Sequence, residues 1–359
     1  MLMLVNLAYL LRRPTGTTNY ALNLLPYLAP LHPRYLATAA SGLPEYQPVP
    51  DDMTAEYGLQ GHLRRLLWTQ FRLPQIYREL TARSAARPLL FAPIIEAPLF
   101  ANCRSIVMVH DLIPLRFQVS QAQTWLHRYY VPQVVKAAEH ILCNSAATAA
   151  DLTQFYDVSP QKITPILLAH DAQHFRPLEL PRQNYFLLLG RQTPYKNTAI
   201  ALQAFAQLPN RQDYEIWIAG PEDLRYTPAL QRQAAELGIT PQVKFLNYVS
   251  YAQLPGLLNQ ALALIFPSLW EGFGLPVLEA MACGTPVIAS NLASIPEVTG
   301  DAALLVEPTD ARAIAHHMHR LICEPALIRH LSNAGCDRAA QFSWSRTGHA
   351  TIEVLKYYL

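Results

Sequence analysis

The sequence predicts an α/β protein of two doubly wound domains, each a parallel sheet covered by helices on both faces. Three observations support this prediction. The chain has 359 residues, more than one hydrophobic core usually supports. Short apolar runs alternate with longer helix-like segments, which is typical of parallel sheets. The alternation occurs on both sides of 170–184, a polar segment with two prolines that we interpret as a linker.

Twelve short apolar runs are the predicted strands. In the first half they are 3–10, 35–40, 88–93, 105–111, 140–145 and 162–168. In the second half they are 185–190, 215–220, 243–248, 261–268, 286–290 and 302–308. Ligands of doubly wound sheets bind beyond the carboxyl ends of the strands. The polar residues just after each run are therefore the candidate site residues.

Composition narrows the class of protein. Hydrophobic residues make up 51% of the chain, too many for a disordered protein. The net charge of +2 argues neither for nor against a polyanionic partner. Five cysteines without a CxxC pair are typical of reduced thiols in a cytosolic protein. The apolar N-terminus precedes its arginines, so we interpret it as a strand rather than a signal peptide. No run reaches the roughly 20 apolar residues of a membrane span.

The stretch "EGFGLPVLEAMACGTP", residues 271–286, predicts an anion site. A buried strand precedes it, and Pro276 suits the first turn of a helix that ends before Gly284. The start of such a helix offers unbonded amides to an anion, here those of Phe273, Gly274 and Leu275. The small residues Gly272 and Gly274 would let a ligand approach the main chain.

Two carboxylates and two cations accompany this turn. Glu279 lies about one turn into the helix, where a carboxylate can accept two hydrogen bonds from a ribose diol. Glu271 precedes the turn, closer to a reacting group. Arg191 and Lys196 follow another strand and together suit a diphosphate. The alternatives are a carboxylate favoured by the helix dipole and two solvated surface cations.

These motifs resemble the retaining glycosyltransferases of family 4, which have the GT-B fold. The resemblance is nearly continuous over 184–308 and is most specific in "EGFGLPVLEAMACGTPV". In the first half it rests on "PTGTTNYALNLLPYL", "VHDLIPLRF" and "ILCNSAATAADL". It implies two Rossmann-like domains facing a central cleft: an acceptor-side domain over 1–172 and a nucleotide-sugar-binding domain over 173–342. The last helix, 343–359, would pack back on the first domain.

The resemblance also implies roles for individual residues. The implied catalytic residues are His110, Glu271, Arg191 and Lys196. The implied donor-binding residues are Gly16, Thr17, Val249, Gly272, Phe273, Gly274, Leu275 and Glu279. The family often has two adjacent glycines where this chain has Gly16 and Thr17, so that loop departs from the pattern.

The implied reaction moves a sugar from a nucleotide-diphosphate sugar to a hydroxyl, with retention of the anomeric configuration. The donor would be GDP-mannose or a UDP-sugar, and the acceptor a saccharide or lipid-linked molecule in cell-surface polysaccharide or glycolipid synthesis. No D-x-D motif occurs, so no metal is required, and no cofactor is expected. Two alternatives are a nucleotide-sugar epimerase on the same fold and a non-catalytic, nucleotide-sugar-binding partner subunit. No nucleic-acid partner is expected.

The segment 62–88 carries six arginines against one glutamate, with apolar residues among them. One interpretation is a pair of amphipathic helices packed on the sheet. The other is a basic face for anionic lipids or a lipid-diphosphate acceptor. The second interpretation predicts a cytoplasmic protein in peripheral contact with the inner face of the membrane.

Overall fold

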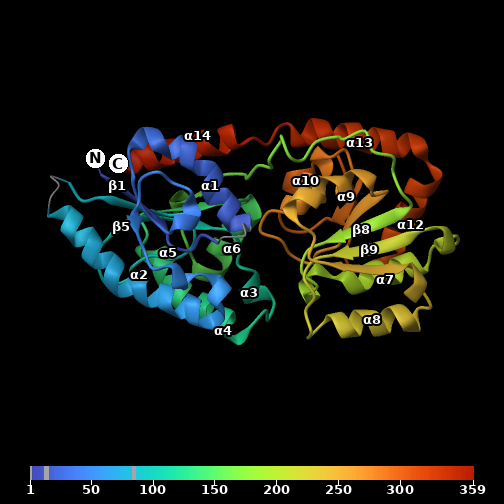
Figure 1. Ribbon diagram of the computed structural model, residues 1–359, viewed down its shortest axis with the longest axis horizontal. Helices are drawn as coiled ribbons and strands as arrows, with labels where there is room; N and C mark the ends of the chain where they lie inside the picture. Colours follow the sequence, from blue (N-terminus) through green and yellow to red (C-terminus); the bar gives the residue numbers. More distant parts are fainter. Residues whose placement is uncertain (1, 12–15, 83–85) are drawn as a thin grey trace. The chain divides into compact units, whose positions relative to one another are not determined.

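The computed structural model describes residues 2–11, 16–82 and 86–359. The chain forms two compact units, which are described separately here (Figure 1). Unit 1 consists of Met1–Leu168 and Trp344–Leu359, and unit 2 consists of Ala169–Ser343. Each unit is a parallel sheet with helices on both faces, so the predicted fold class is confirmed.

Unit 1 contains a seven-stranded parallel sheet in the order β3-β2-β1-β4-β5-β6-β7. Its strands are β1 (Met3–Leu7), β2 (Arg34–Ala37), β3 (Gln47–Pro48), β4 (Leu89–Ala92), β5 (Arg104–Val109), β6 (His140–Cys143) and β7 (Ile163–Pro165). The central strands are buried on both faces, which explains their continuous apolar sequences.

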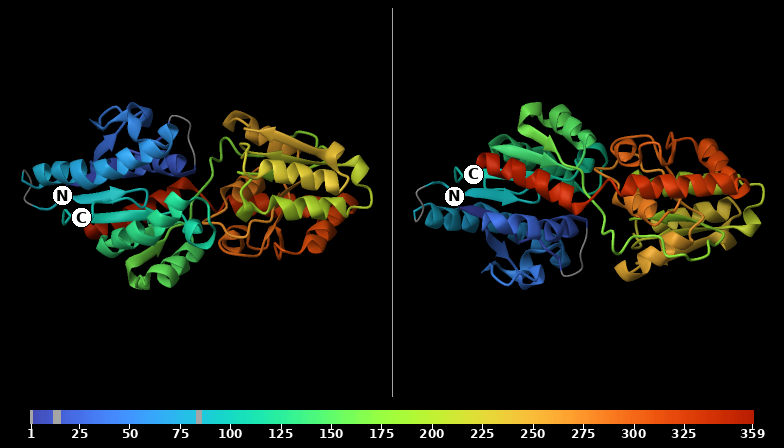
Figure 2. Two further views of the ribbon diagram at one scale, coloured as in Figure 1. Left: turned by 90° about the horizontal axis from the view of Figure 1, so that it is seen from below. Right: turned by 90° about the horizontal axis from the view of Figure 1, so that it is seen from above.

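The helices of unit 1 lie in two layers. They are α1 (Gly16–Leu28), α2 (Gly58–Thr81), α3 (Ile113–Arg116), α4 (Gln121–Trp125), α5 (Val131–Ala137), α6 (Ala146–Tyr156) and α14 (Trp344–Tyr358). Buried side chains of α2, α5 and α6 pack on one face of the sheet, and α1 and α14 lie on the other (Figure 2). In α14, Gly348 allows close packing, because a Cβ there would lie 2.3 Å from the Tyr27 ring of α1.

Unit 2 contains a six-stranded parallel sheet in the order β10-β9-β8-β11-β12-β13. Its strands are β8 (Tyr185–Leu189), β9 (Glu215–Ala219), β10 (Val243–Asn247), β11 (Ala263–Phe266), β12 (Val287–Ser290) and β13 (Leu304–Val306). Its helices are α7 (Thr198–Ala206), α8 (Thr227–Glu236), α9 (Leu254–Gln260), α10 (Leu275–Ala282), α11 (Ile295–Thr299), α12 (Ala311–Cys323) and α13 (Pro325–Ala339). Helices α7, α8 and α12 bury their apolar sides on one face, and α9 and α10 lie on the other (Figure 1).

The structure corrects one prediction about 62–88. The described part of this segment does not form a pair of helices, because α2 runs unbroken for 24 residues through Pro74. Residues 83–85 of the segment lie outside the described residues. None of the helices in the described part of the chain is long and apolar enough to cross a membrane.

Candidate active site

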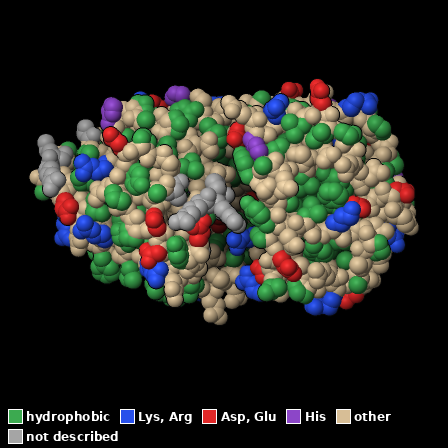
Figure 3. All heavy atoms as spheres, viewed as in Figure 1, with side chains coloured by type: hydrophobic (Ala, Val, Ile, Leu, Met, Phe, Trp, Pro, Cys, Tyr) green, Lys and Arg blue, Asp and Glu red, His purple; other side chains and the backbone are tan. Residues whose placement is uncertain are grey.

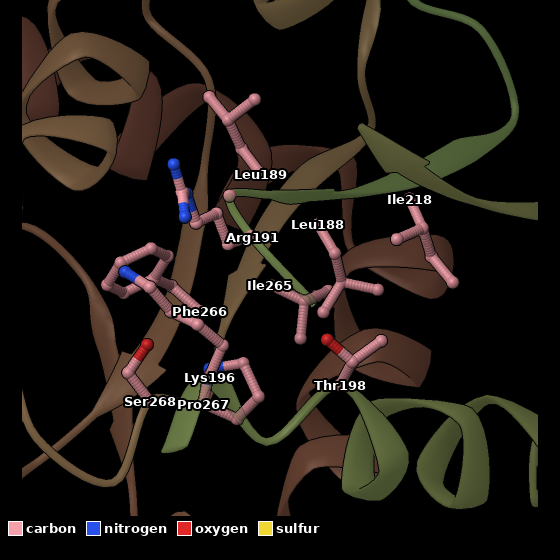
Figure 4. A pocket seen from close by; sticks show the side chains of 11 residues that line it. Leu188, Leu189, Arg191, Lys196, Thr198, Ile218, Ile265, Phe266, Pro267 and Ser268 are labelled. Carbon is pink, nitrogen blue, oxygen red and sulfur yellow. The ribbon is translucent and has the colours of Figure 1, made fainter. Parts of the chain in front are cut away.

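In unit 2 the ends of β8 and β11 lie side by side where the strand order of the sheet reverses. β8 pairs with β9 on one side and with β11 on the other. Doubly wound sheets bind ligands at this point, beyond the carboxyl ends of the strands. A pocket lies there, and its lining includes Gly190, Arg191, Lys196, Thr198, Pro267 and Ser268 (Figure 4).

Lys196 and Glu271 form an ion pair beside this pocket. The Lys196 Nζ atom lies 2.6 Å from Glu271 Oε1, and the two side chains are only 17% and 10% exposed. The lysine also lies 5.0 Å from the centre of the Phe266 ring. Sequence analysis found both residues in the second half of the chain. It assigned Lys196 to the diphosphate of the donor and Glu271 to the reacting end. The structure joins them, so each holds the other in position before any ligand binds.

Two other polar groups of the pocket make no hydrogen bond to described residues, although the hydrogen bond from Arg225 and, to a lesser degree, the charge of Arg191 lower the pKa of Asp223. The exposed Arg191 makes no hydrogen bond or ion pair with any described residue. The hydroxyl of Ser268 is buried, and within the described chain it has no hydrogen-bond partner either. Sequence analysis missed Ser268, although its position two residues beyond β11 is a signal that could have found it. Both groups are available to donate hydrogen bonds to an anion.

The turn before α10 has the form that the sequence predicts. Gly274 has a φ of +104°, in a region that favours glycine, and a Cβ there would lie 2.6 Å from Ile295 Cδ1. The amides of residues 273–275 donate no hydrogen bond to described residues. The buried hydroxyl of Ser294 lies 3.1 Å from the Glu271 carbonyl oxygen and 2.9 Å from that of Phe273. Ser294, which sequence analysis missed, therefore fixes the turn that presents these amides.

Glu279 lies one turn into α10, as predicted. Burial raises the pKa of its carboxyl from 4.5 to about 8. The side chain is half-buried and makes no hydrogen bond to the described part of the chain. Val249 lies half-buried in the loop after β10, two residues before Tyr251. The Glu279 carboxylate contributes to the raised pKa of Tyr251, although desolvation by burial is the main cause.

In unit 1, His110 follows β5. Its Nε2 atom lies 3.0 Å from the Pro93 carbonyl oxygen, and its ring meets the Tyr20 ring edge-on at 5.1 Å. Burial lowers the pKa of His110 to about 4, so the ring is neutral at pH 7. Because a carbonyl only accepts hydrogen bonds, Nε2 carries the proton and Nδ1 presents a lone pair. Gly16 and Thr17, also predicted site residues, begin α1 in the same unit.

The loop that holds His110 is itself fixed by α2. Arg65 of α2 donates two hydrogen bonds of 2.8 Å to the Glu96 carboxylate, and both side chains are largely buried. Gln70 of α2 donates to the Ala97 carbonyl oxygen and accepts a hydrogen bond from the amide of Leu99. Sequence analysis missed these contacts because the partners are separated by about thirty residues. The loop after β4 is thus positioned by side chains of a neighbouring helix.

Comparison with known proteins gives matches along most of the chain. The family profile described as "Glycosyl transferases group 1" matches residues 170–338, and "Glycosyltransferase Family 4" matches 14–173. The O-antigen chain mannosyltransferase B of Escherichia coli is 33% identical over 222 residues, or 61% of this chain and 55% of that protein. An MMP alpha-(1->4)-mannosyltransferase of Mycolicibacterium hassiacum is 32% identical over 251 residues, or 66% and 61%. The match therefore spans somewhat more than half the length of these relatives.

Solved structures share the fold at low identity. A structure of Anabaena Alr3699/HepE in complex with UDP and glucose has a TM-score of 0.77 at 19% identity, covering 99% of this chain and 100% of that one. WaaG, a glycosyltransferase involved in lipopolysaccharide biosynthesis, has a TM-score of 0.72 at 14% identity, covering 98% and 99%. At this level of identity the similarity establishes the architecture of the chain.

Proposed function

The chain belongs to the group 1, family 4 glycosyltransferases, and we propose that it transfers a sugar from a nucleotide-diphosphate sugar to a hydroxyl of a saccharide or lipid-linked acceptor. One observation carries the proposal. At the carboxyl ends of β8 and β11, the Lys196–Glu271 pair and the exposed Arg191 lie beside a pocket. Cations beside a pocket, one of them held by an ion pair, suit a leaving group that gains negative charge.

The donor in this proposal is GDP-mannose or a UDP-sugar. Mannosyltransferases among the relatives favour mannose, and the structures of HepE with UDP favour a nucleoside diphosphate. The diphosphate would contact Arg191, Lys196 and the amides of residues 273–275. Glu279 would accept hydrogen bonds from the ribose, and the backbone of Val249 would contact the base. In unit 1, Gly16 and Thr17 would approach the diphosphate.

The proposed mechanism retains the anomeric configuration. Lys196, Arg191 and the helix amides stabilise the charge on the leaving diphosphate, and the acceptor hydroxyl attacks from the same face and gives its proton to that diphosphate. Glu271 is a poor candidate for a covalent nucleophile, because one of its oxygens is held 2.6 Å from the Lys196 ammonium. We assign Glu271 to orienting Lys196 and the sugar.

His110 has a narrower role in this proposal. Its Nδ1 atom is free to accept a hydrogen bond from a sugar hydroxyl, since Nε2 is committed to Pro93. With a pKa of about 4, it cannot serve as a proton donor near neutral pH. We therefore propose that His110 orients the donor sugar rather than acting as an acid.

The proposed setting is the cytoplasm, in contact with the inner face of an anionic membrane. Relatives in O-antigen synthesis favour cell-surface polysaccharide synthesis.

Transfer should persist in excess EDTA, because the sequence holds no D-x-D pair and the two cations neutralise the diphosphate. Complete loss of transfer that added metal restores would contradict this part of the proposal.

A screen of nucleotide sugars tests the function. The true donor should raise the melting temperature, because it binds only the folded state. With that donor and a range of saccharide acceptors, product analysis then separates transfer from epimerisation, and the absence of any turnover would favour a non-catalytic subunit. If Arg191→Ala and Lys196→Ala both retain near-normal transfer, the diphosphate assignment is wrong.

A further inference from the structure

The outward face of α2 carries a stripe of large apolar side chains in solvent. Leu59, Leu63, Leu67 and Phe71 recur every fourth residue and are 71%, 55%, 48% and 66% exposed. Residues four apart lie on the same side of a helix, so the four side chains form a continuous row. Single exposed apolar residues are ordinary, whereas a contiguous row of four marks an interaction surface.

The inner face of the same helix is already occupied. Leu73, Ile76, Tyr77 and Leu80 pack into the core against β1, β2 and β4, and Arg65 holds the loop after β4. The exposed row is therefore not a displaced core face.

Arginines flank the row. The helix has four arginines and one glutamate, and only Arg65 among the arginines is buried. Arg64 pairs with Asp52 at 3.0 Å on the exposed surface, and Arg72 lies 3.9 Å from Glu79. Exposed pairs of this kind are weak and exchange readily for other anions. Green, blue and red side chains lie close together over this region (Figure 3, lower left).

We propose that this face of α2 binds the surface of an anionic lipid bilayer. The apolar row would enter the boundary between headgroups and acyl chains, while Arg64, Arg72 and Arg78 contact lipid phosphates. The helix lies on the bilayer and does not cross it, since its inner side is fixed to the sheet. The choice of a bilayer as the partner rests on the proposed function, because a lipid-linked acceptor lies at a lipid surface.

The charge pattern favours a bilayer over a second copy of the chain. In a two-fold symmetric dimer the same face would meet itself. Each copy would then bring Arg64, Arg72 and Arg78 into the contact, against Glu79 of this helix and Asp52 beside Arg64. Like charges would face one another across the apolar row, whereas lipid phosphates complement them.

Sedimentation of the full chain with vesicles tests the proposal. The vesicles contain phosphatidylcholine alone or phosphatidylcholine mixed with phosphatidylglycerol. The two test variants are Leu67→Gln with Phe71→Gln, and Arg72→Gln with Arg78→Gln. Leu224→Gln is the matched control, since Leu224 is an exposed leucine of unit 2, at 82%. Thermal unfolding checks that each variant is folded, which surface substitutions should leave unchanged.

The chain should bind the mixed vesicles, more weakly at high salt. Removing Leu67 and Phe71 should reduce partitioning by roughly a hundredfold, since each buried apolar side chain is worth about tenfold. Removing Arg72 and Arg78 should reduce binding to mixed vesicles and weaken its salt dependence. The Leu224 variant should bind like the parent protein.

Two results would overturn the proposal. One is equal binding of the parent and the Leu67/Phe71 variant, or no binding by either. The other is a concentration-dependent increase in the parent's mass in light scattering that the Leu67/Phe71 variant abolishes, which would identify the face as a contact between copies. Neither depends on catalysis, and transfer to a soluble acceptor tests the proposed function separately.

Discussion

At the scale of single residues, the ion pair between Lys196 and Glu271 is the feature on which the proposed chemistry most depends. Lys196→Ala should lower the free energy of unfolding by about 3–5 kcal/mol, because it leaves a largely buried carboxylate without its cation. It should also reduce turnover by roughly a hundredfold. Adding Glu271→Gln should restore much of the stability but not the turnover.

Urea unfolding and transfer assays of the single and double variants measure both effects. A single variant as stable as the parent would show that the pair contributes little before ligand binds. A double variant that regained turnover would remove Lys196 from the proposed charge stabilisation.

Glu279 predicts a pH dependence of nucleotide binding. Its pKa is raised by burial to about 8, so the carboxyl is mostly protonated at pH 7. Two ribose hydroxyls bind best to the ionised form, which accepts at both oxygens. Affinity for the nucleoside diphosphate should therefore rise as pH increases towards 8 and level off above it.

The same pKa makes the free protein less stable as pH rises. Between about 4.5 and 8 the folded state holds a proton that the unfolded state has released, so the free energy of unfolding falls across this range. Calorimetric titration and urea unfolding at several pH values measure both slopes. Glu279→Gln should remove them, and this variant also corrects for titration of the ligand's own phosphate. Slopes unchanged in Glu279→Gln would assign them to other groups.

Sequence analysis identified candidate residues of the site but not the contacts between them. Lys196 and Glu271 were recognised singly, from their positions after strands. Their pairing follows from the order of the sheet, which brings β8 beside β11, and no local pattern encodes that order. Ser294 was missed for a related reason. A serine before a short helix predicts a cap, and here its hydroxyl instead bonds to two carbonyls more than twenty residues away.

At the scale of elements, the turn before α10 is the element whose local structure sequence analysis predicted most completely. Gly274→Ala should lower the free energy of unfolding by about 2 kcal/mol, because an alanine is strained at a φ of +104°. It should also weaken binding of the nucleoside diphosphate, since the amides of residues 273–275 depend on this turn. Chemical unfolding and calorimetric titration give the two quantities.

Gly256→Ala is the control for this prediction. Gly256 lies in α9 without positive φ, and a Cβ there would meet nothing within 4 Å among the described residues. This variant should be as stable as the parent or more stable by up to about 1 kcal/mol. Equal effects of the two substitutions would mean that the turn is not fixed by Gly274.

The strands were predicted far more completely than the helices. All twelve apolar runs overlap strands of the structure, and the central strands are uniformly apolar because they are buried on both faces. β3, with two residues, has no apolar run and was missed. One of the two interpretations of the arginine-rich segment was a pair of helices. Packing of both halves on one sheet face keeps α2 continuous instead.

At the scale of the whole molecule, the chain leaves unit 1 after Leu168 and returns to it at Trp344. Sequence analysis predicted a linker at 170–184 from the alternation on both sides of this polar segment and from its two prolines. The return of the last helix was expected only from the family resemblance. The amphipathic pattern of a helix predicts that one side packs on an apolar surface. It does not specify which of the two sheets provides that surface.

The division into units predicts how damage to α14 should spread. Gly348→Val places a branched side chain where an added Cβ alone would lie 2.3 Å from the Tyr27 ring, so α14 should separate from α1. Amide hydrogen exchange should then accelerate within 2–168, although this segment is distant from α14 in the sequence. The amides of 169–343 should stay protected from exchange. The nucleoside diphosphate should still bind and further protect 169–343, because the proposed contacts with Arg191, Lys196 and Glu279 belong to unit 2. Exchange that rose equally in both ranges would show that the units unfold as one, and the diphosphate site would then depend on the packing of α14.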